Sequence, residues 1–136
     1  MTYVIYVLHS RQTESHADLA VDQLRAAGHQ AESVDCDQIT INALRGMPAV
    51  IVIVDSSKTS AFLDSLASAS NLGLRATLFS VRTIGEQVNA VSRQLVSHLS
   101  RHGGQQLGAS CPTSLSFIDW ARFVAQNLHT AAAKLQ

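Results

Sequence analysis

Apolar and polar residues succeed one another along this chain in blocks that predict strands alternating with helices. The surest strand is 49–54, because its six consecutive apolar residues are typical of a strand buried on both faces of a sheet. Residues 3–8 form a similar β-branched run. Shorter patterns predict strands at 76–81 and 107–111, and the less apolar alternation at 31–36 is better suited to a sheet edge.

Helical spacing of apolar residues marks the segments between these strands. The first helix is expected at 15–27 and to end at Gly28, since glycine commonly terminates helices. A short helix is expected around 62–66, and a longer one over 86–101. Ser116 is a suitable cap for a final helix with an apolar stripe from Phe117 to Ala131.

This alternation predicts a single α/β domain over 1–136, with three layers and a five-stranded parallel sheet of order 2-1-3-4-5. Ligands of such sheets bind beyond the carboxyl ends of the strands, where the strand order reverses. Here that position lies beside the first and third strands. Three loops would meet there, at 8–15, 55–60 and 80–86, and any small-molecule site is expected among them.

Composition narrows the classes of function. Ten basic residues balance ten acidic ones, so the chain has no net charge to attract nucleic acid or an anionic membrane. The longest apolar run, 49–54, is too short to span a bilayer, and the amino terminus lacks a signal-type segment, so a soluble, cytoplasmic protein is expected. Cys36 and Cys111 have no metal-site or redox-motif spacing and are expected to be free thiols.

The loop after the first strand is the strongest candidate site. Ser10, Arg11, Gln12 and Thr13 can all donate hydrogen bonds, and they lead into a helix whose free backbone N–H groups and dipole favour an anion. A phosphate group fits that chemistry. Equally, Ser10 or Thr13 could cap the helix while Glu14 complements its dipole, and the residues alone leave both interpretations open.

Three other patterns are weaker candidates for a functional site. His98 and His102 have a spacing that can bind a metal, but no third ligand is evident, and a position on the solvent face and last turn of a helix suits them better. Asp55 follows a central strand as a phosphate acceptor does, yet Leu8 and His9 stand where an acidic pair would hold Mg²⁺. A serine hydrolase is disfavoured because no G-x-S-x-G motif exists.

The chain resembles the short flavodoxins. The resemblance lies in the loop 10–14, which is similar to the loop that wraps the FMN phosphate, and in 103–109 followed by 117–121, which look like the last strand and helix of the family. It implies that Ser10, Gln12 and Thr13 hold the phosphate. Arg11 replaces a family glycine, so its side chain could block the phosphate or pair with it.

The resemblance implies an FMN-binding electron-transfer protein that serves a redox partner protein, rather than a stand-alone enzyme. The flavin carries the chemistry, so no catalytic residue and no metal site is predicted. Neither flanking loop contains the aromatic residues with which the family covers the ring. Two alternatives therefore stay open: a module that has lost its flavin and serves binding or regulation, and an enzyme that acts on a small phosphorylated ligand. The residues expected to flank the ring are Ser56, Ser57, Ser80, Val81 and Arg82.

Overall fold

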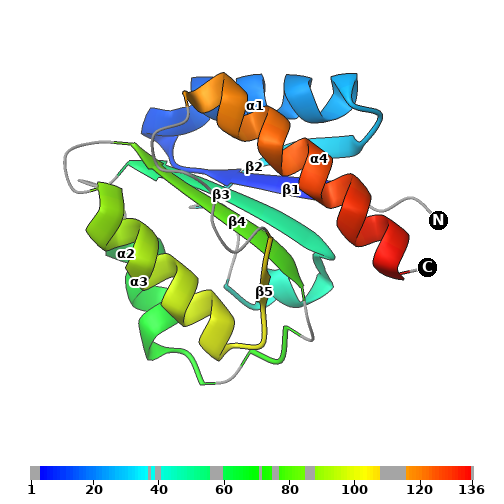
Figure 1. The fold of residues 1–136 in the computed structure, drawn as a ribbon. Coiled ribbons are helices and arrows are strands. Elements are labelled where there is room, and N and C mark those ends of the chain that lie inside the picture. Colours follow the sequence, from blue (N-terminus) through cyan, green and yellow to red (C-terminus); the bar gives the residue numbers. More distant parts are fainter. Residues whose placement is uncertain are drawn as a thin grey trace.

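A computed structural model shows a parallel sheet covered by helices on both faces (Figure 1). The structure describes residues 4–36, 38, 41–55, 60–70, 72–74, 77–84, 88–107 and 116–135, with backbone only for 41, 60–63, 88–90 and 130–135. Within these ranges, no helix is long and apolar enough to cross a membrane.

The sheet contains five parallel strands in the order β2-β1-β3-β4-β5, which confirms the predicted topology. Strand β3 lies at the centre and β2 at an edge, as the apolar content of their residues predicts. The strands are β1 (Val4–His9), β2 (Gln30–Asp35), β3 (Ala49–Asp55), β4 (Leu78–Ile84) and β5 (Gln105–Gln106).

The four predicted helices are present, together with two short 3₁₀ helices that the hydropathy pattern did not predict. Gly28 ends the first helix in the left-handed region, at φ 93°, as expected for a glycine at that position. The helices are α1 (Glu14–Ala26), α2 (Ser60–Ser68), α3 (Val88–Arg101) and α4 (Phe117–Leu135), and the 3₁₀ helices are η1 (Arg11–Thr13) and η2 (Ile41–Gly46).

Two strand boundaries were predicted wrongly. Strand β4 continues to Ile84, so 80–84 belongs to the sheet and not to a loop. Its polar residues have partners there, since the hydroxyl oxygens of Thr83 and Ser92 lie 2.7 Å apart. Strand β5 is Gln105–Gln106, two residues before the predicted 107–111, because pairing with β4 begins directly after the turn at the end of α3. Residues 108–111 lie outside the described part of the chain.

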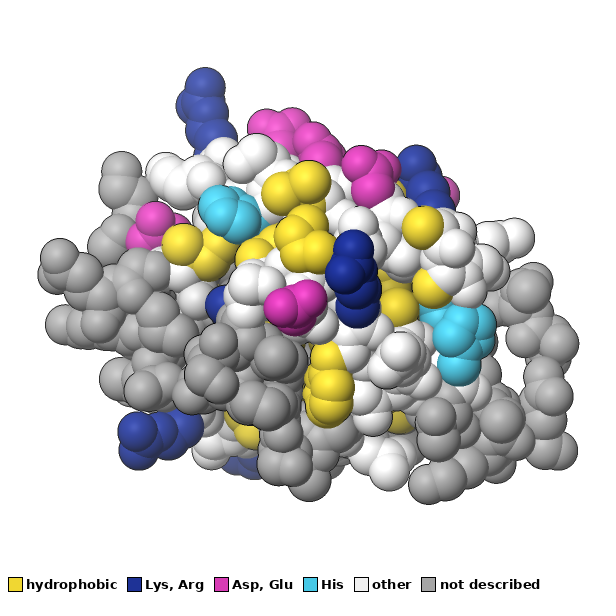
Figure 2. Space-filling model, turned by 45° about the horizontal axis from the view of Figure 1, so that its top comes forward, with side chains coloured by type: hydrophobic (Ala, Val, Ile, Leu, Met, Phe, Trp, Pro, Cys, Tyr) yellow, Lys and Arg dark blue, Asp and Glu magenta, His cyan; other side chains and the backbone are white. Residues whose placement is uncertain are grey.

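The core has two halves, one on each face of the sheet. Side chains alternate along β3: Ala49, Ile51 and Ile53 pack under α1 and α4, whereas Val50, Val52 and Val54 pack under α2 and α3. Figure 2 shows the outer surface of the α1/α4 half, where acidic side chains gather along the margin formed by α1. Cys36 is buried in the α2/α3 half and forms no disulfide, while Cys111 lies outside the described residues.

Candidate functional site at the carboxyl edge of the sheet

The loop after β1 lies at the position where the strand order reverses. Strands β1 and β3 are neighbours, and the chain continues from β1 to α1 on one face of the sheet but from β3 to α2 on the other. Their two carboxyl ends therefore diverge to opposite faces, which is the geometry that opens a crevice in parallel sheets. The η1 turn follows β1 at this edge of the sheet and leads directly into α1.

Thr13 fastens the loop to the central strand. Its hydroxyl donates a hydrogen bond of 2.7 Å to the carbonyl oxygen of Ile53 in β3. The Thr13 hydroxyl oxygen also accepts a hydrogen bond from the backbone N–H of Ser10, at 3.1 Å. Only 1% of Thr13 is exposed, so this hydroxyl serves the internal structure of the loop.

The hydroxyl of Ser10 is also used within the loop. It lies 3.2 Å from the Thr13 hydroxyl oxygen, and 5% of the residue is exposed. The Thr13 hydroxyl also lies within hydrogen-bond distance of two carbonyl oxygens, that of Ile53 at 2.7 Å and that of Ser10 at 3.2 Å. A phosphate contact from either hydroxyl would require one of these bonds to be exchanged.

Arg11 and Gln12 are the exposed members of the loop. They form the turn between the buried Ser10 and Thr13, at the amino end of the helical segment that η1 and α1 make together. First-turn N–H groups of a helix lack internal partners, and the dipole adds partial positive charge there. A guanidinium and an amide are side chains that can donate hydrogen bonds to an anion at this point.

Strand β4 places the other predicted residues at different depths. Ser80 is buried in the middle of the strand, opposite Ile51, and Val81 packs partly against the α2/α3 half of the core. Arg82 is half-buried, with its guanidinium carbon 5.9 Å from the centre of the Trp120 ring. Ser56 and Ser57 lie outside the described residues.

A cluster of aromatic rings joins the first turns of α1 and α4. This cluster was not predicted from the sequence. The His16 and Phe117 rings meet edge to face with centroids 5.1 Å apart, and Phe117 lies 5.5 Å from Trp120. The Nδ1 atom of His16 is buried and has no hydrogen-bond partner within the described residues. Aromatic residues are thus close to the loop, although they come from α4 and not from the loops after β3 and β4.

The prediction of a solvent-exposed His102 is wrong. The ring is 1% exposed, and both of its nitrogens are bonded: Nε2 donates to the Leu66 carbonyl at 2.8 Å, and Nδ1 accepts the Leu72 N–H at 3.2 Å. A ring used in this way offers no lone pair to a metal. Partial burial, together with the positive charge of the neighbouring Arg101, lowers the pKa of His98 below its ordinary value.

Comparison with solved structures shows the same architecture in flavodoxins. A flavodoxin from Streptococcus pneumoniae is 17% identical with a TM-score of 0.71, and the match covers 94% of this chain and 98% of that one. A short-chain flavodoxin associated with a PDU bacterial microcompartment is 15% identical with a TM-score of 0.73, over 97% and 99%. Flavodoxin 2 from Bacillus cereus is 14% identical with a TM-score of 0.69, over 96% and 99%.

No protein-family model and no curated protein sequence matches the chain. The likeness is therefore one of three-dimensional structure, and it extends over nearly the whole of both chains. The protein has the flavodoxin-like fold, as its sequence pattern predicts.

Proposed function

We propose that this chain binds FMN at the carboxyl edge of β1 and β3 and exchanges electrons with a partner protein. The observation that carries the proposal is the exposed Arg11–Gln12 turn at the amino end of a helix, at the carboxyl edge of the sheet of a flavodoxin-like fold. FMN, when bound, supplies the redox chemistry, and the protein supplies binding and orientation.

In this proposal the members of the loop have different roles. The Arg11 guanidinium, the Gln12 amide and the backbone N–H groups of the first turn hold the phosphate, because they face solvent at the helix end. Thr13 and Ser10 hold the turn in place through the bonds to each other and to Ile53. The sequence after β3 adds Ser56 and Ser57 as polar flanks for the ring.

A second candidate, a flavin-free binding or regulatory module, is favoured by one specific observation. Both loop hydroxyls are already used within the protein, and Arg11 stands where the resemblance predicts glycine. In this alternative Ser10 and Thr13 are structural residues, and the fold serves recognition without a cofactor.

Titration of FMN against the purified protein separates the two candidates. Binding at micromolar concentration, seen as quenching of FMN fluorescence, is the expected result. Riboflavin, which lacks the phosphate, should bind at least tenfold more weakly, since loss of a charge-assisted contact costs about 1.5–3 kcal/mol. Free FMN fluorescence at concentrations well above micromolar would overturn the electron-carrier proposal and leave the flavin-free module.

The role of Arg11 is tested by removing its side chain. Arg11→Ala is expected to weaken FMN binding by about tenfold to a hundredfold, the equivalent of one charge-assisted hydrogen bond. Arg93→Ala is the matched control, because Arg93 is an exposed arginine on α3 in the other half of the molecule. Tighter binding by Arg11→Ala or Arg11→Gly would show that the side chain obstructs the phosphate.

A further inference from the structure

A stacked pair of histidines joins the carboxyl end of α1 to α4. The rings of His29 and His129 lie with centroids 4.1 Å apart and planes tilted by 33°. His29 directly follows the turn that ends α1, and its backbone N–H is bonded to the Leu24 carbonyl at 3.0 Å. The pair is on the outer surface of the α1/α4 half, where histidine side chains reach the surface near the carboxyl end of α4 (Figure 2).

Each ring is bonded to the backbone of the opposite segment. Nε2 of His29 lies 3.1 Å from the carbonyl oxygen of Ala125 in α4, and Nε2 of His129 lies 2.8 Å from the carbonyl oxygen of Ala27 at the end of α1. A carbonyl oxygen only accepts, so both Nε2 atoms carry the proton and, in the neutral rings, both Nδ1 atoms carry the lone pair. Two reciprocal bonds therefore tie α4 to α1, and because both Nε2 donors remain in the protonated rings, charge weakens the tie through repulsion between the rings.

Among the described residues, the groove beside the pair offers no acidic side chain that would balance added positive charge. The adjoining surface groove is lined by alanine and glutamine residues of both helices, with Arg122 of α4 and His129 as its charged or titratable groups. Arg25 of α1 is turned toward β2, where it donates to the Ala31 carbonyl. The carboxyl end of the α1 dipole favours one positive charge near Ala27, but two charged rings in contact repel each other.

The direction of the pH effect follows from His29. Burial lowers its pKa below 6.5, the hydrogen bond to Ala125 offsets part of this, and positive charge on His129 lowers it further. Above pH 6.5 the ring is mostly neutral in the folded and the unfolded chain. Below pH 6.5 the unfolded chain takes up the proton first, so stability is lost as the pH falls toward the pKa of the folded state.

We propose that His29 and His129 form a pH-sensitive clasp, which holds the carboxyl half of α4 on the end of α1 near neutral pH and releases it when both rings are protonated. The clasp is independent of FMN binding, since it lies on the helices and not in the loop after β1. Protonation adds positive charge to two rings that are stacked against each other, and the repulsion between them opposes the hydrogen bonds that hold α4 on α1.

The coupling between the rings is tested by an NMR titration of the histidine side chains. In His129→Gln the pKa of His29 is expected to rise toward 6.5, because glutamine can still donate to Ala27 but carries no charge. His98→Gln is the matched control, on α3 in the other half of the molecule, and should leave the titration of His29 unchanged. Identical His29 titrations in the wild type and in His129→Gln would overturn the proposal.

Release of α4 is tested by amide hydrogen exchange, corrected for the intrinsic effect of pH. Protection of the amides at 125–129 is expected to fall as the pH is lowered from 7.5 to 5.5, because the folded chain binds the His29 proton less readily than the unfolded chain. The double variant His29→Gln/His129→Gln should lose this pH dependence. An equal loss in both proteins would contradict a clasp, and if the double variant does not fold, the titration of His29 in His129→Gln still decides.

Discussion

Histidine side chains bonded to backbone carbonyls fasten both faces of the sheet, but in opposite surroundings. Under α2 and α3, His102 is 1% exposed and joins the end of α3 to Leu66 in α2 and to Leu72 in the segment after α2 through two hydrogen bonds. Over α1 and α4, His129 is exposed and His29 half-buried, and water can replace their bonds. Loss of a histidine-to-carbonyl hydrogen bond is therefore expected to lower stability strongly on the α2/α3 face, where it is buried, and only slightly on the α1/α4 face, where water can replace it.

The largest effect is expected from His102→Phe. Phenylalanine can fill the space of the ring, but it leaves the buried Leu72 N–H without its partner and the Leu66 carbonyl with only the bond from Arg101, at 3.2 Å. The free energy of unfolding should fall by about 3 kcal/mol, since a buried group without a partner costs about 1–3 kcal/mol and the carbonyl loses its shorter bond. Urea denaturation measures the change.

His129→Phe is the control on the other face. There the Ala27 carbonyl accepts its bond from an exposed side chain and can turn to water, so we expect a loss below about 1 kcal/mol. Similar losses from the two substitutions would show that burial does not separate the two faces as described.

A smaller difference in stability is expected between alanine substitutions at two glycines, one on each face of the sheet. A Cβ at Gly104 would lie 2.9 Å from the Leu99 carbonyl oxygen and from the Phe79 ring, so Gly104→Ala should cost about 2 kcal/mol through overpacking. A Cβ at Gly28 meets nothing within 4 Å, but its φ is 93°, so Gly28→Ala should cost about 1 kcal/mol from the backbone alone. Thermal unfolding compares them, and a neutral Gly104→Ala would mean that the Phe79 ring can move aside.

The strand order and the division of the core could be predicted because they depend on hydropathy at short range. The six apolar residues of β3 need cover on both faces, and the weaker pattern of β2 suits an edge. Gly28 and Ser116 are likewise local signals, one for the end of α1 and one for the start of α4. Each of these predictions uses only residues within a few positions of the feature.

The polar contacts could not be predicted, because their partners are distant in the sequence. Thr13 looks like a phosphate ligand in isolation, but its hydroxyl bonds to Ile53, forty residues away. His102 looks like an exposed residue in the last turn of a helix, yet it lies against Leu66, thirty-six residues away. The polar end of β4 has the pattern of a loop in the sequence, because the partners of Thr83 and Arg82 are Ser92 in α3 and Trp120 in α4.

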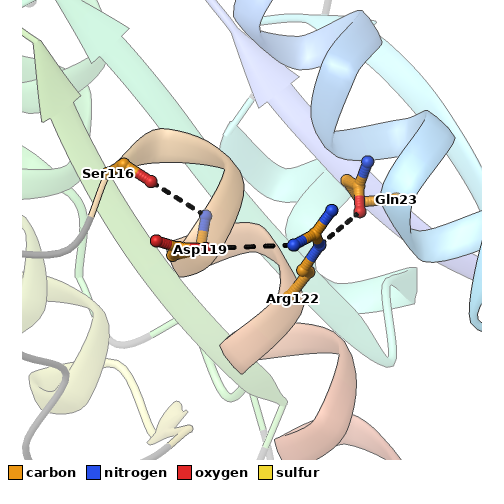
Figure 3. A network of polar contacts seen from close by, with 4 residues as sticks. All are labelled: Gln23, Ser116, Asp119 and Arg122. Atoms are coloured by element: carbon orange, nitrogen blue, oxygen red, sulfur yellow. Dashed lines mark hydrogen bonds and ion pairs between the residues drawn. The ribbon is translucent and has the colours of Figure 1, made fainter.

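The smallest effect is expected in the surface network at the start of α4, shown in Figure 3. Arg122 lies 4.0 Å from Asp119 and donates to Gln23 of α1 at 3.3 Å, with both charged side chains more than half exposed. Exposed ion pairs of this kind contribute little, so Arg122→Ala should change the free energy of unfolding by less than about 0.5 kcal/mol.

Ser116→Ala, in the same network, should cost more, at about 1 kcal/mol. Its hydroxyl accepts the backbone N–H of Asp119, one of the first-turn groups that α4 itself cannot satisfy. Helix capping then outweighs the ion pair although the two interactions are neighbours and equally open to water. A loss of stability for Arg122→Ala that exceeds the loss for Ser116→Ala would instead show that the hydrogen bond from Arg122 to Gln23 holds α4 on α1. The α1/α4 face would then depend less on its histidines.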